Sequence, residues 1–294
     1  MTLSAISSPH ESEPSPSQRA DRVGRSAIQV DLVGGRSRLV RSVSQDPLKL
    51  LPTKSGDERC CSVVVSNYGG GFLQGDDAHL TVDCSADTRL YLGTQALNKV
   101  YRCPTGRARQ TIEGKLGRGA RVVSLPDPVM LFAESRYEQR QSWQMKPGSV
   151  LAIADGMVSG RRAMGESFEF ASYSSDTRIY LNSRPVAIES ARCEPGRMSH
   201  SGAAVFGSKN VTFTLMIAGS SGESCFERTV SELETCIGEG HTEEVIVAFT
   251  KPKEDVAMVR LMADSLAIAD ETIRRLNGCV AERMLNFDPI SRKT

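Results

Sequence analysis

The chain has 294 residues, of which 39% are hydrophobic and 24% are charged, and its formal net charge is +1. This near-neutral balance excludes a global electrostatic field that would attract nucleic acid or an acidic membrane surface. Aromatic residues make up only 5% of the chain, which leaves little for stacking on nucleic-acid bases. No apolar run approaches the roughly 18 residues that span a bilayer, so the composition predicts a soluble globular protein.

The N-terminal stretch, residues 1–24, is rich in serine, proline and charge and poor in apolar residues. It cannot bury enough surface to become ordered, so we predict a disordered tail. It has no apolar core of a secretory signal, and its acidic residues disfavour a transit peptide, so we expect a cytoplasmic location. Residues 25–294 are expected to form a single domain. Its expected parts are a β body over about 25–220, strands plus two helices over about 221–280, and a docking tail over about 281–294.

Short segments with alternating apolar residues fill the β body. Gly, Pro and Asp separate them, as is typical of strands joined by turns. Parallel strands would need helical crossovers between these segments, and no helical period is visible there. We therefore predict a mainly β fold of stacked antiparallel sheets, like a sandwich. The segments are 28–32, 63–65, 80–84, 90–92, 112–116, 122–125, 150–153, 168–170, 179–181, 186–188 and 211–217.

Helical spacing replaces this alternation after residue 221. Phe226, Val230 and Leu233 predict a first helix that ends at Gly238. After a strand over 245–249, apolar residues spaced three and four apart over 259–276 predict a second helix, closed by Asn277 and Gly278. This stripe is expected to face the protein's own sheet or a partner helix. An exposed stripe would make the chain fold poorly without a partner.

A run of glycines stands at the end of a β-branched strand, where it removes every Cβ from the turn. The backbone there can bend sharply or approach another segment closely. A phosphate-binding loop is excluded, because two aspartates and a strand follow in place of Lys and Ser or Thr, so a phosphate would meet like charge. The residues of this loop are Gly69, Gly70, Gly71, Gly75, Asp76 and Asp77.

A second polar turn begins at Thr94 and Gln95, after two further strands. It leads into a basic segment that contains Lys99, Tyr101 and Arg102. If the two strands form a hairpin, the acidic and the basic loop lie on one side of the sheet. We therefore expect Arg102 to pair with one of the two aspartates of the acidic loop.

Taken together, the segments YGGGFLQGDD and LGTQALNKVYR resemble the paired signature of the urease accessory protein family called UreD or UreH. A second block resembles the family over 126–132 and in YEQRQSW from Tyr137, and a third in ADGMVSGRRAMGESFEF from Ala154 to Phe170. The blocks keep the family's order. The motif residues to which the resemblance points are Gly69, Gly70, Gly71, Gly75, Asp77, Thr94, Gln95, Lys99, Tyr101, Arg102, Arg161, Gly165 and Glu166.

The resemblance implies a maturation factor and not an enzyme. It implies binding to apo-urease together with a helical partner, UreF, and a GTPase, UreG, which jointly deliver nickel into the urease active site. It also implies no resident cofactor, so that Ni²⁺ would contact this chain only transiently.

Two carboxylates stand out in the β body. Asp155 and Glu189 each end an apolar run, where the interior of a sheet should begin. A buried carboxylate needs a cation, a hydrogen-bond donor or water, so we expect either ion pairs with Arg161 or Arg162 or a hydrated channel. The eight cysteines and four histidines are dispersed without the spacing of a zinc site, so we expect no preformed metal cage.

We predict that Asp76, Asp155 and Glu189 line a wet passage for nickel, because oxygen ligands along water bind a divalent ion weakly enough to release it. Two other classes of protein remain open. The first is a metal-dependent hydrolase that uses Asp76, Asp77 and His79, which should show turnover by itself. The second is a carbohydrate-binding sandwich, which needs an exposed aromatic platform; a single tryptophan, Trp143, argues against it.

Overall fold

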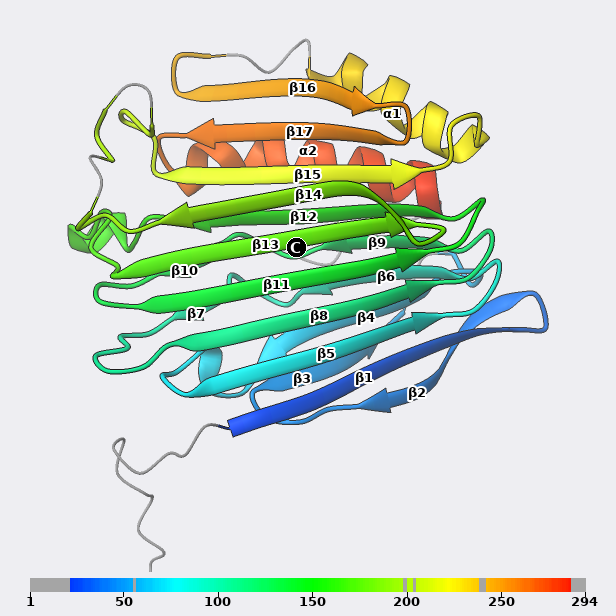
Figure 1. Cartoon of the computed structure of the whole chain (residues 1–294), viewed down its shortest axis with the longest axis horizontal. Coiled ribbons are helices and arrows are strands. Elements are labelled where there is room, and N and C mark those ends of the chain that lie inside the picture. Colours follow the sequence, from blue (N-terminus) through cyan, green and yellow to red (C-terminus); the bar gives the residue numbers. More distant parts are fainter. Residues whose placement is uncertain (1–21, 55–56, 198–199, 203–204, 238–241, 287–294) are drawn as a thin grey trace, which may run out of the picture.

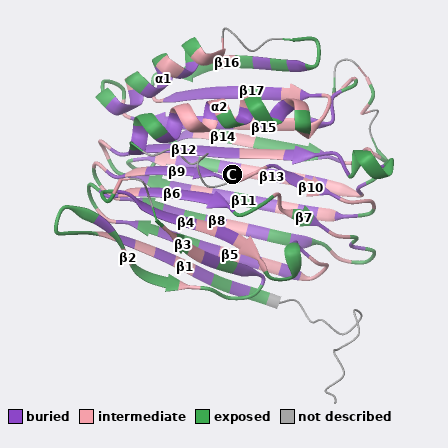
Figure 2. Cartoon of the chain, turned by 180° about the vertical axis from the view of Figure 1, so that it is seen from behind, coloured by how far each residue is buried: buried purple, intermediate pink, exposed green. Residues whose placement is uncertain are grey.

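A computed structural model describes residues 22–54, 57–197, 200–202, 205–237 and 242–286. Two β-sheets lie one on the other, and two helices cover the outer face of the larger sheet (Figures 1 and 2). The prediction of a mainly β protein with stacked sheets and two C-terminal helices is therefore confirmed. Among the described residues, no helix is long and apolar enough to cross a membrane.

The smaller sheet has seven strands, and it forms the near face of the molecule in Figure 1. Its outer face carries mostly polar side chains, and its inner face carries apolar ones at every second position, as expected of a sheet that is covered on one side. In spatial order its strands are β14 (Arg184–Cys193), β13 (Ser172–Leu181), β11 (Arg136–Met145), β8 (Ala108–Leu116), β5 (Asp76–Cys84), β1 (Arg22–Val33) and β2 (Arg36–Val43).

The larger sheet has ten strands and is covered on both faces over part of its width, so its central strands are buried almost continuously. A short strand pair, β10 (Val129–Leu131) and β7 (Lys99–Val100), joins it beside β12. In spatial order the other strands are β16 (Val245–Lys253), β17 (Val256–Ala263), β15 (Val211–Gly219), β12 (Val150–Val158), β9 (Arg121–Leu125), β6 (Arg89–Thr94), β4 (Cys61–Asn67) and β3 (Leu48–Thr53).

The predicted antiparallel pairing is wrong in the centre of both sheets. Strands β5, β8, β11 and β13 pair in parallel, and so do β4, β6, β9 and β12. Parallel pairing needs no helix here, because the chain alternates between the sheets, so a strand of one sheet serves as the crossover for the other. For the same reason β5 and β6 lie in different sheets and do not form the expected hairpin.

The first predicted helix is confirmed as α1 (Ser224–Ile237), whereas the second begins and ends later than expected. The N-terminal part of the expected stripe, including Val259 and Met262, belongs to β17. Helix α2 (Leu266–Leu285) begins after Ser265, whose side chain accepts a hydrogen bond from the Ile268 N–H. It runs through Asn277 and Gly278 and ends at a left-handed Asn286.

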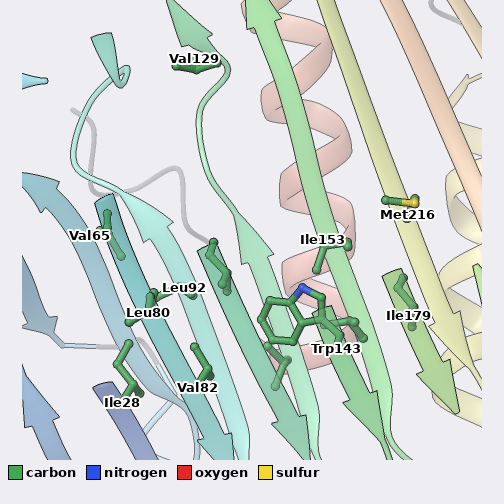
Figure 3. Packing of buried hydrophobic residues seen from close by; sticks show 14 of the residues in the cluster. Ile28, Val65, Leu80, Val82, Leu92, Val129, Trp143, Ile153, Ile179 and Met216 are labelled. Carbon is green, nitrogen blue, oxygen red and sulfur yellow. The ribbon is translucent and has the colours of Figure 1, made fainter. Parts of the chain in front are cut away.

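Two hydrophobic cores stabilise this arrangement. The larger core fills the space between the sheets, where Ile153 and Ile179 lie near Trp143 and Leu80 lies further along the same layer (Figure 3). The second core lies between the larger sheet and the helices, and it contains Ile273. Burying each large apolar side chain contributes about 1.5–3 kcal/mol. The helices therefore pack on the protein's own sheet, which removes the exposed stripe on which the expectation of poor folding was based.

The ends of the chain differ from the predicted boundaries. Strand β1 begins at Arg22, inside the stretch 1–24 that was assigned to a disordered tail, and it pairs there with the start of β5. Helix α2 includes the first residues of the expected docking tail, 281–294. Residues 1–21 and 287–294 lie outside the described residues.

Candidate functional site

Asp155, on β12 of the larger sheet, is bound by three neutral side chains from the smaller sheet. Gln139 Nε2 donates to Asp155 Oδ1 at 3.0 Å, and the Tyr173 hydroxyl donates to the same oxygen at 3.4 Å. The Ser175 hydroxyl donates to Oδ2. Gln139 faces inward because it shares the inner positions of β11 with Tyr137 and Trp143, two and four residues away.

These contacts set the proton affinity of the Asp155 carboxyl. Removal from water raises its pKa, and the hydrogen bonds from Ser175 and Gln139 oppose that rise. The nearby carboxylate also adds to the burial that raises the pKa of Tyr137 and of Tyr173. No basic side chain appears among the hydrogen-bond donors to Asp155 in the described part of the chain. When the Asp155 carboxyl is ionised, its charge is therefore not neutralised by a hydrogen-bonded cation of the described residues.

Two small cavities lie on either side of Asp155 and Gly156. The first has a volume of about 30 Å³ and extends past Gln110 toward Thr94 and Asp127. The second has a volume of about 40 Å³ and extends past Ser175 to Glu189. Each is large enough for one or two water molecules, and its polar walls can satisfy them. The side chains along this line, which we call the polar row, are Thr94, Asp127, Gln110, Gln139, Asp155, Ser175 and Glu189.

Glu189 stands at the end of the polar row, where the smaller sheet ends at β14. Its carboxylate accepts a hydrogen bond of 2.8 Å from Arg260 of β17. A wider groove of about 460 Å³ shares Glu189 and Met216 with the second cavity, and it lies between β14 and the last strands of the larger sheet. Asp155 and Glu189, which sequence reasoning linked, are therefore both beside the same cavity.

Asp76 lies elsewhere. It is buried at the start of β5, where its carboxylate accepts a hydrogen bond of 2.7 Å from the Leu73 N–H, and it is not among the residues that line either cavity. The alternative expectation, ion pairs of Asp155 or Glu189 with Arg161 or Arg162, is contradicted by the contacts of both carboxylates described above.

The glycine loop packs against the basic segment through its backbone. Gly69, Gly70 and Gly75 have φ angles of 78°, 77° and 87°, in the left-handed region that side chains disfavour. A Cβ on Gly71 would collide with the Lys99 carbonyl and the Tyr101 ring. The close approach predicted for this loop is thus made to the protein's own chain.

Motif residues from all three sequence blocks meet beside this loop. The rings of Tyr101 and Phe132 pack edge to face with centroids 5.3 Å apart, and the Arg161 guanidinium lies 4.2 Å from the centre of the Phe132 ring. Arg161 also pairs with Glu166, and this contact lowers the pKa of the Glu166 carboxyl. Gly165 provides the left-handed end of the short 3₁₀ helix Arg162–Met164 between them. The arrangement holds three loops together.

The remaining motif residues have local partners. Thr94 Oγ1 donates to Asp127 Oδ2 at 2.9 Å, and the Gln95 N–H donates to the Val65 carbonyl at 3.0 Å. Arg102 pairs with Glu134 at 2.7 Å. The expected pair of Arg102 with Asp76 or Asp77 is therefore not formed, because β5 and β6 do not make a hairpin.

The structure does not support the two other classes of protein considered from the sequence, a metal-dependent hydrolase and a carbohydrate-binding sandwich. Asp76 points to the interior, whereas Asp77 and His79 lie on the opposite face of β5, and His79 pairs with Glu113 at 3.2 Å. The three side chains of the expected hydrolase site therefore do not converge. Trp143 is fully buried and offers no platform for a sugar. Within the described ranges, no three His, Cys, Asp or Glu side chains are placed to hold a metal ion together.

Sequence reasoning missed three neutral side chains of the polar row, Gln110, Gln139 and Ser175. A signal for them exists in the segment that begins at Tyr137. There, glutamines alternate in register with Trp143 and Met145, which are both buried. Polar residues on the apolar face of an alternating strand indicate a polar feature inside the protein.

The fold and the site together define a two-layer β protein with a polar row between its sheets and two helices on one outer face. The UreD urease accessory protein family matches residues 22–293. The chain therefore belongs to the UreD family of urease accessory proteins.

Individual relatives agree with this family. The UreD urease accessory protein of Cytophaga hutchinsonii is 27% identical over 275 residues, which cover 90% of this chain and 96% of that protein. The UreD protein of Anaeromyxobacter sp. is 35% identical over 176 residues, 60% of this chain and 59% of that protein. Urease accessory protein D of Oryza sativa subsp. japonica is 33% identical over 181 residues, 60% of this chain and 59% of that protein.

Proposed function

We propose that this chain is a non-catalytic maturation factor that holds apo-urease together with a UreF-type helical protein and a UreG-type GTPase. In this assembly nickel passes along the polar row on its way to the urease active site. Membership of the UreD family supports the role in maturation. The observation that carries the passage is that one carboxylate, Asp155, borders two cavities between the sheets and takes its hydrogen bonds from neutral donors.

The chemistry of the polar row suits a transient divalent ion. Its walls offer carboxylate, amide and hydroxyl oxygens, which hard and borderline cations accept, and among the residues that the structure describes no histidine or cysteine lines either cavity. Cavities of this size hold few waters, so an ion gives up part of its hydration shell and takes oxygen atoms from the walls. A site with few fixed ligands releases the ion again, as delivery requires.

The test is the nickel content of urease matured in the presence of variants. Asp155→Asn and Glu189→Gln should lower nickel loading while the accessory complex still assembles, and Glu189→Lys should abolish loading by repelling the cation. Asp176→Asn is the matched control, because Asp176 is a carboxylate on the outer face of the same sheet, paired with Arg178. Normal loading with Glu189→Lys and with Asp155→Asn would overturn the passage, and failure of the complex to form would point to a structural role.

A further inference from the structure

Helices α1 and α2 lie antiparallel against each other on the outer face of the larger sheet. Their register is fixed by an ion pair between Glu232 of α1 and Arg283 of α2. One helical turn onward along α1 is Cys236, and one turn back along α2 is Cys279. In antiparallel helices Cys236 and Cys279 therefore face each other, just as Glu232 and Arg283 face each other one turn away.

The helix register brings the two thiols close together. Cys236 is near enough across the helix interface to raise the pKa of the Cys279 thiol. Both cysteines retain partial exposure to solvent, whereas the other six cysteines are buried. This pair therefore differs from the neighbouring Cys60 and Cys61, where both thiols are buried and the Cys60 thiol donates to the carbonyl of Cys61.

We propose that Cys236 and Cys279 form a modification site, a dithiol that low-molecular-weight disulfides oxidise to a reversible disulfide between α1 and α2. The deprotonated Cys236 sulfur attacks the small disulfide, forms a mixed disulfide and releases one small thiol. Cys279 then loses its proton to solvent and attacks the Cys236 sulfur, which releases the second small thiol. Two protein thiols are thereby oxidised, and one small disulfide is reduced to two thiols.

The order of these steps follows from the surroundings of Cys279. Burial raises the pKa of its thiol to about 12, and the adjacent Cys236 and Glu282 add to that rise. Cys279 therefore remains a thiol until a mixed disulfide has formed beside it, and the first attack falls to Cys236. In a reducing compartment a dithiol of this kind is oxidised only transiently, so its disulfide serves as a switch and not as a permanent part of the fold.

Oxidation would link the C-terminal end of α1, at Cys236, covalently to Cys279 of α2. A disulfide that closes a loop of this length restricts the unfolded chain, so Tm should rise by about 5–10 °C. The helices cover the second core, which contains Phe226 and Ile273, so this part of the protein should become more resistant to local opening.

The experiment treats the purified full-length chain with glutathione disulfide and maps the products by peptide mass spectrometry. The expected result is one cross-link, between Cys236 and Cys279, with a higher Tm that a dithiol reductant reverses. Cys236→Ser and Cys279→Ser should each abolish the cross-link and the Tm shift. Cys225→Ser is the matched control on α1, because Cys225 is buried away from α2's thiol, and this variant should still form the disulfide.

Two results would overturn the proposal. The first is a wild-type chain in which Cys236 and Cys279 each carry a stable mixed disulfide with glutathione, since adjacent thiols would have resolved it. The second is a 236–279 cross-link that forms equally fast in denaturant, since the folded helix register would then have no part in it. Because the mapping is made on the wild-type chain, the test does not depend on whether a serine variant folds.

Discussion

Gln139 and Asp155 belong to different sheets and meet across the space between them, with Gln139 Nε2 donating to Asp155 Oδ1 at 3.0 Å. The contact places an ionisable group among the neutral side chains of the polar row, between the two sheets. Such a group costs stability when it is charged and not paired with a cation. Burial accordingly raises the pKa of the Asp155 carboxyl, because the charged form is the costly one in this position.

The first prediction concerns the pH dependence of stability of Asp155→Asn. Burial raises the pKa of Asp155 in the folded protein, so the folded state binds this proton more tightly than the unfolded chain. Asp155 therefore stabilises the folded state at acid pH, and this contribution to the free energy of unfolding is lost as pH rises through the raised pKa. Asparagine has no proton to lose, so the variant should gain stability relative to wild type as pH rises above about 4, the ordinary pKa of an unfolded aspartic acid. Denaturant unfolding at several pH values measures this difference.

Asp176→Asn is the control for that measurement. The hydrogen bond with Arg178 lowers the pKa of Asp176, so the pH dependence has the opposite sign. The stability of wild type relative to Asp176→Asn should increase as pH rises. If Asp155→Asn behaved in the same way as Asp176→Asn, the fold would stabilise the ionised form of Asp155, and the raised pKa of this carboxyl would be contradicted.

The second prediction separates charge from structure at the end of the polar row. Glu189→Gln and Arg260→Gln both break the same partly exposed ion pair, so each should change stability by only about 0–1 kcal/mol. They leave opposite net charges beside the second cavity. Nickel loading of urease should fall with Glu189→Gln and stay the same or rise with Arg260→Gln. Equal losses of nickel loading in the two variants would show that the intact ion pair matters and that the net charge beside the second cavity does not.

The third prediction concerns the loop contact of Arg102. A double-mutant cycle with Arg102→Ala and Glu134→Ala should give a coupling of about 0.2–1 kcal/mol, because both side chains are exposed. The corresponding cycle with Asp76→Asn should be additive, since Arg102 pairs with Glu134 instead. Coupling found only in the second cycle would restore the pair expected from the sequence.

Much of the fold could be predicted from local patterns. Strand positions followed from alternation, because a strand with one covered face must alternate, as Leu80, Val82 and Cys84 do on β5. Helix α1 followed from its spacing and from the glycine after it. The parallel pairing could not be predicted, because each strand's sequence is the same whichever direction its neighbour runs. The second helix was misplaced because Val259 and Met262 keep helical spacing by chance inside a buried strand.

The site could be predicted only in part. Asp155 and Glu189 were found because a carboxylate ending an apolar run is unusual, and the structure places both beside one cavity. Asp76, which follows the glycine loop, was grouped with them, yet its carboxylate accepts a hydrogen bond from the Leu73 N–H of that loop. Local sequence does not distinguish a carboxylate that caps a turn from one that lines a cavity, because the difference depends on residues of another strand.

The last prediction concerns the centre of the main core. Trp143 of β11 stands directly opposite Gly114 of β8, and its ring lies over that glycine, where a Cβ would collide with the ring. Gly114→Ala should therefore displace a fully buried tryptophan and lower the free energy of unfolding by about 2–4 kcal/mol. Gly196→Ala is the control, since no atom of the described residues lies within 4 Å of its added methyl group, and its effect should stay within about 0.5 kcal/mol. Denaturant unfolding followed by the fluorescence of this single tryptophan measures both variants. A Gly114→Ala protein as stable as Gly196→Ala would mean that the two central strands can shift to admit a side chain, and that the close packing of Trp143 does not determine the spacing of the smaller sheet.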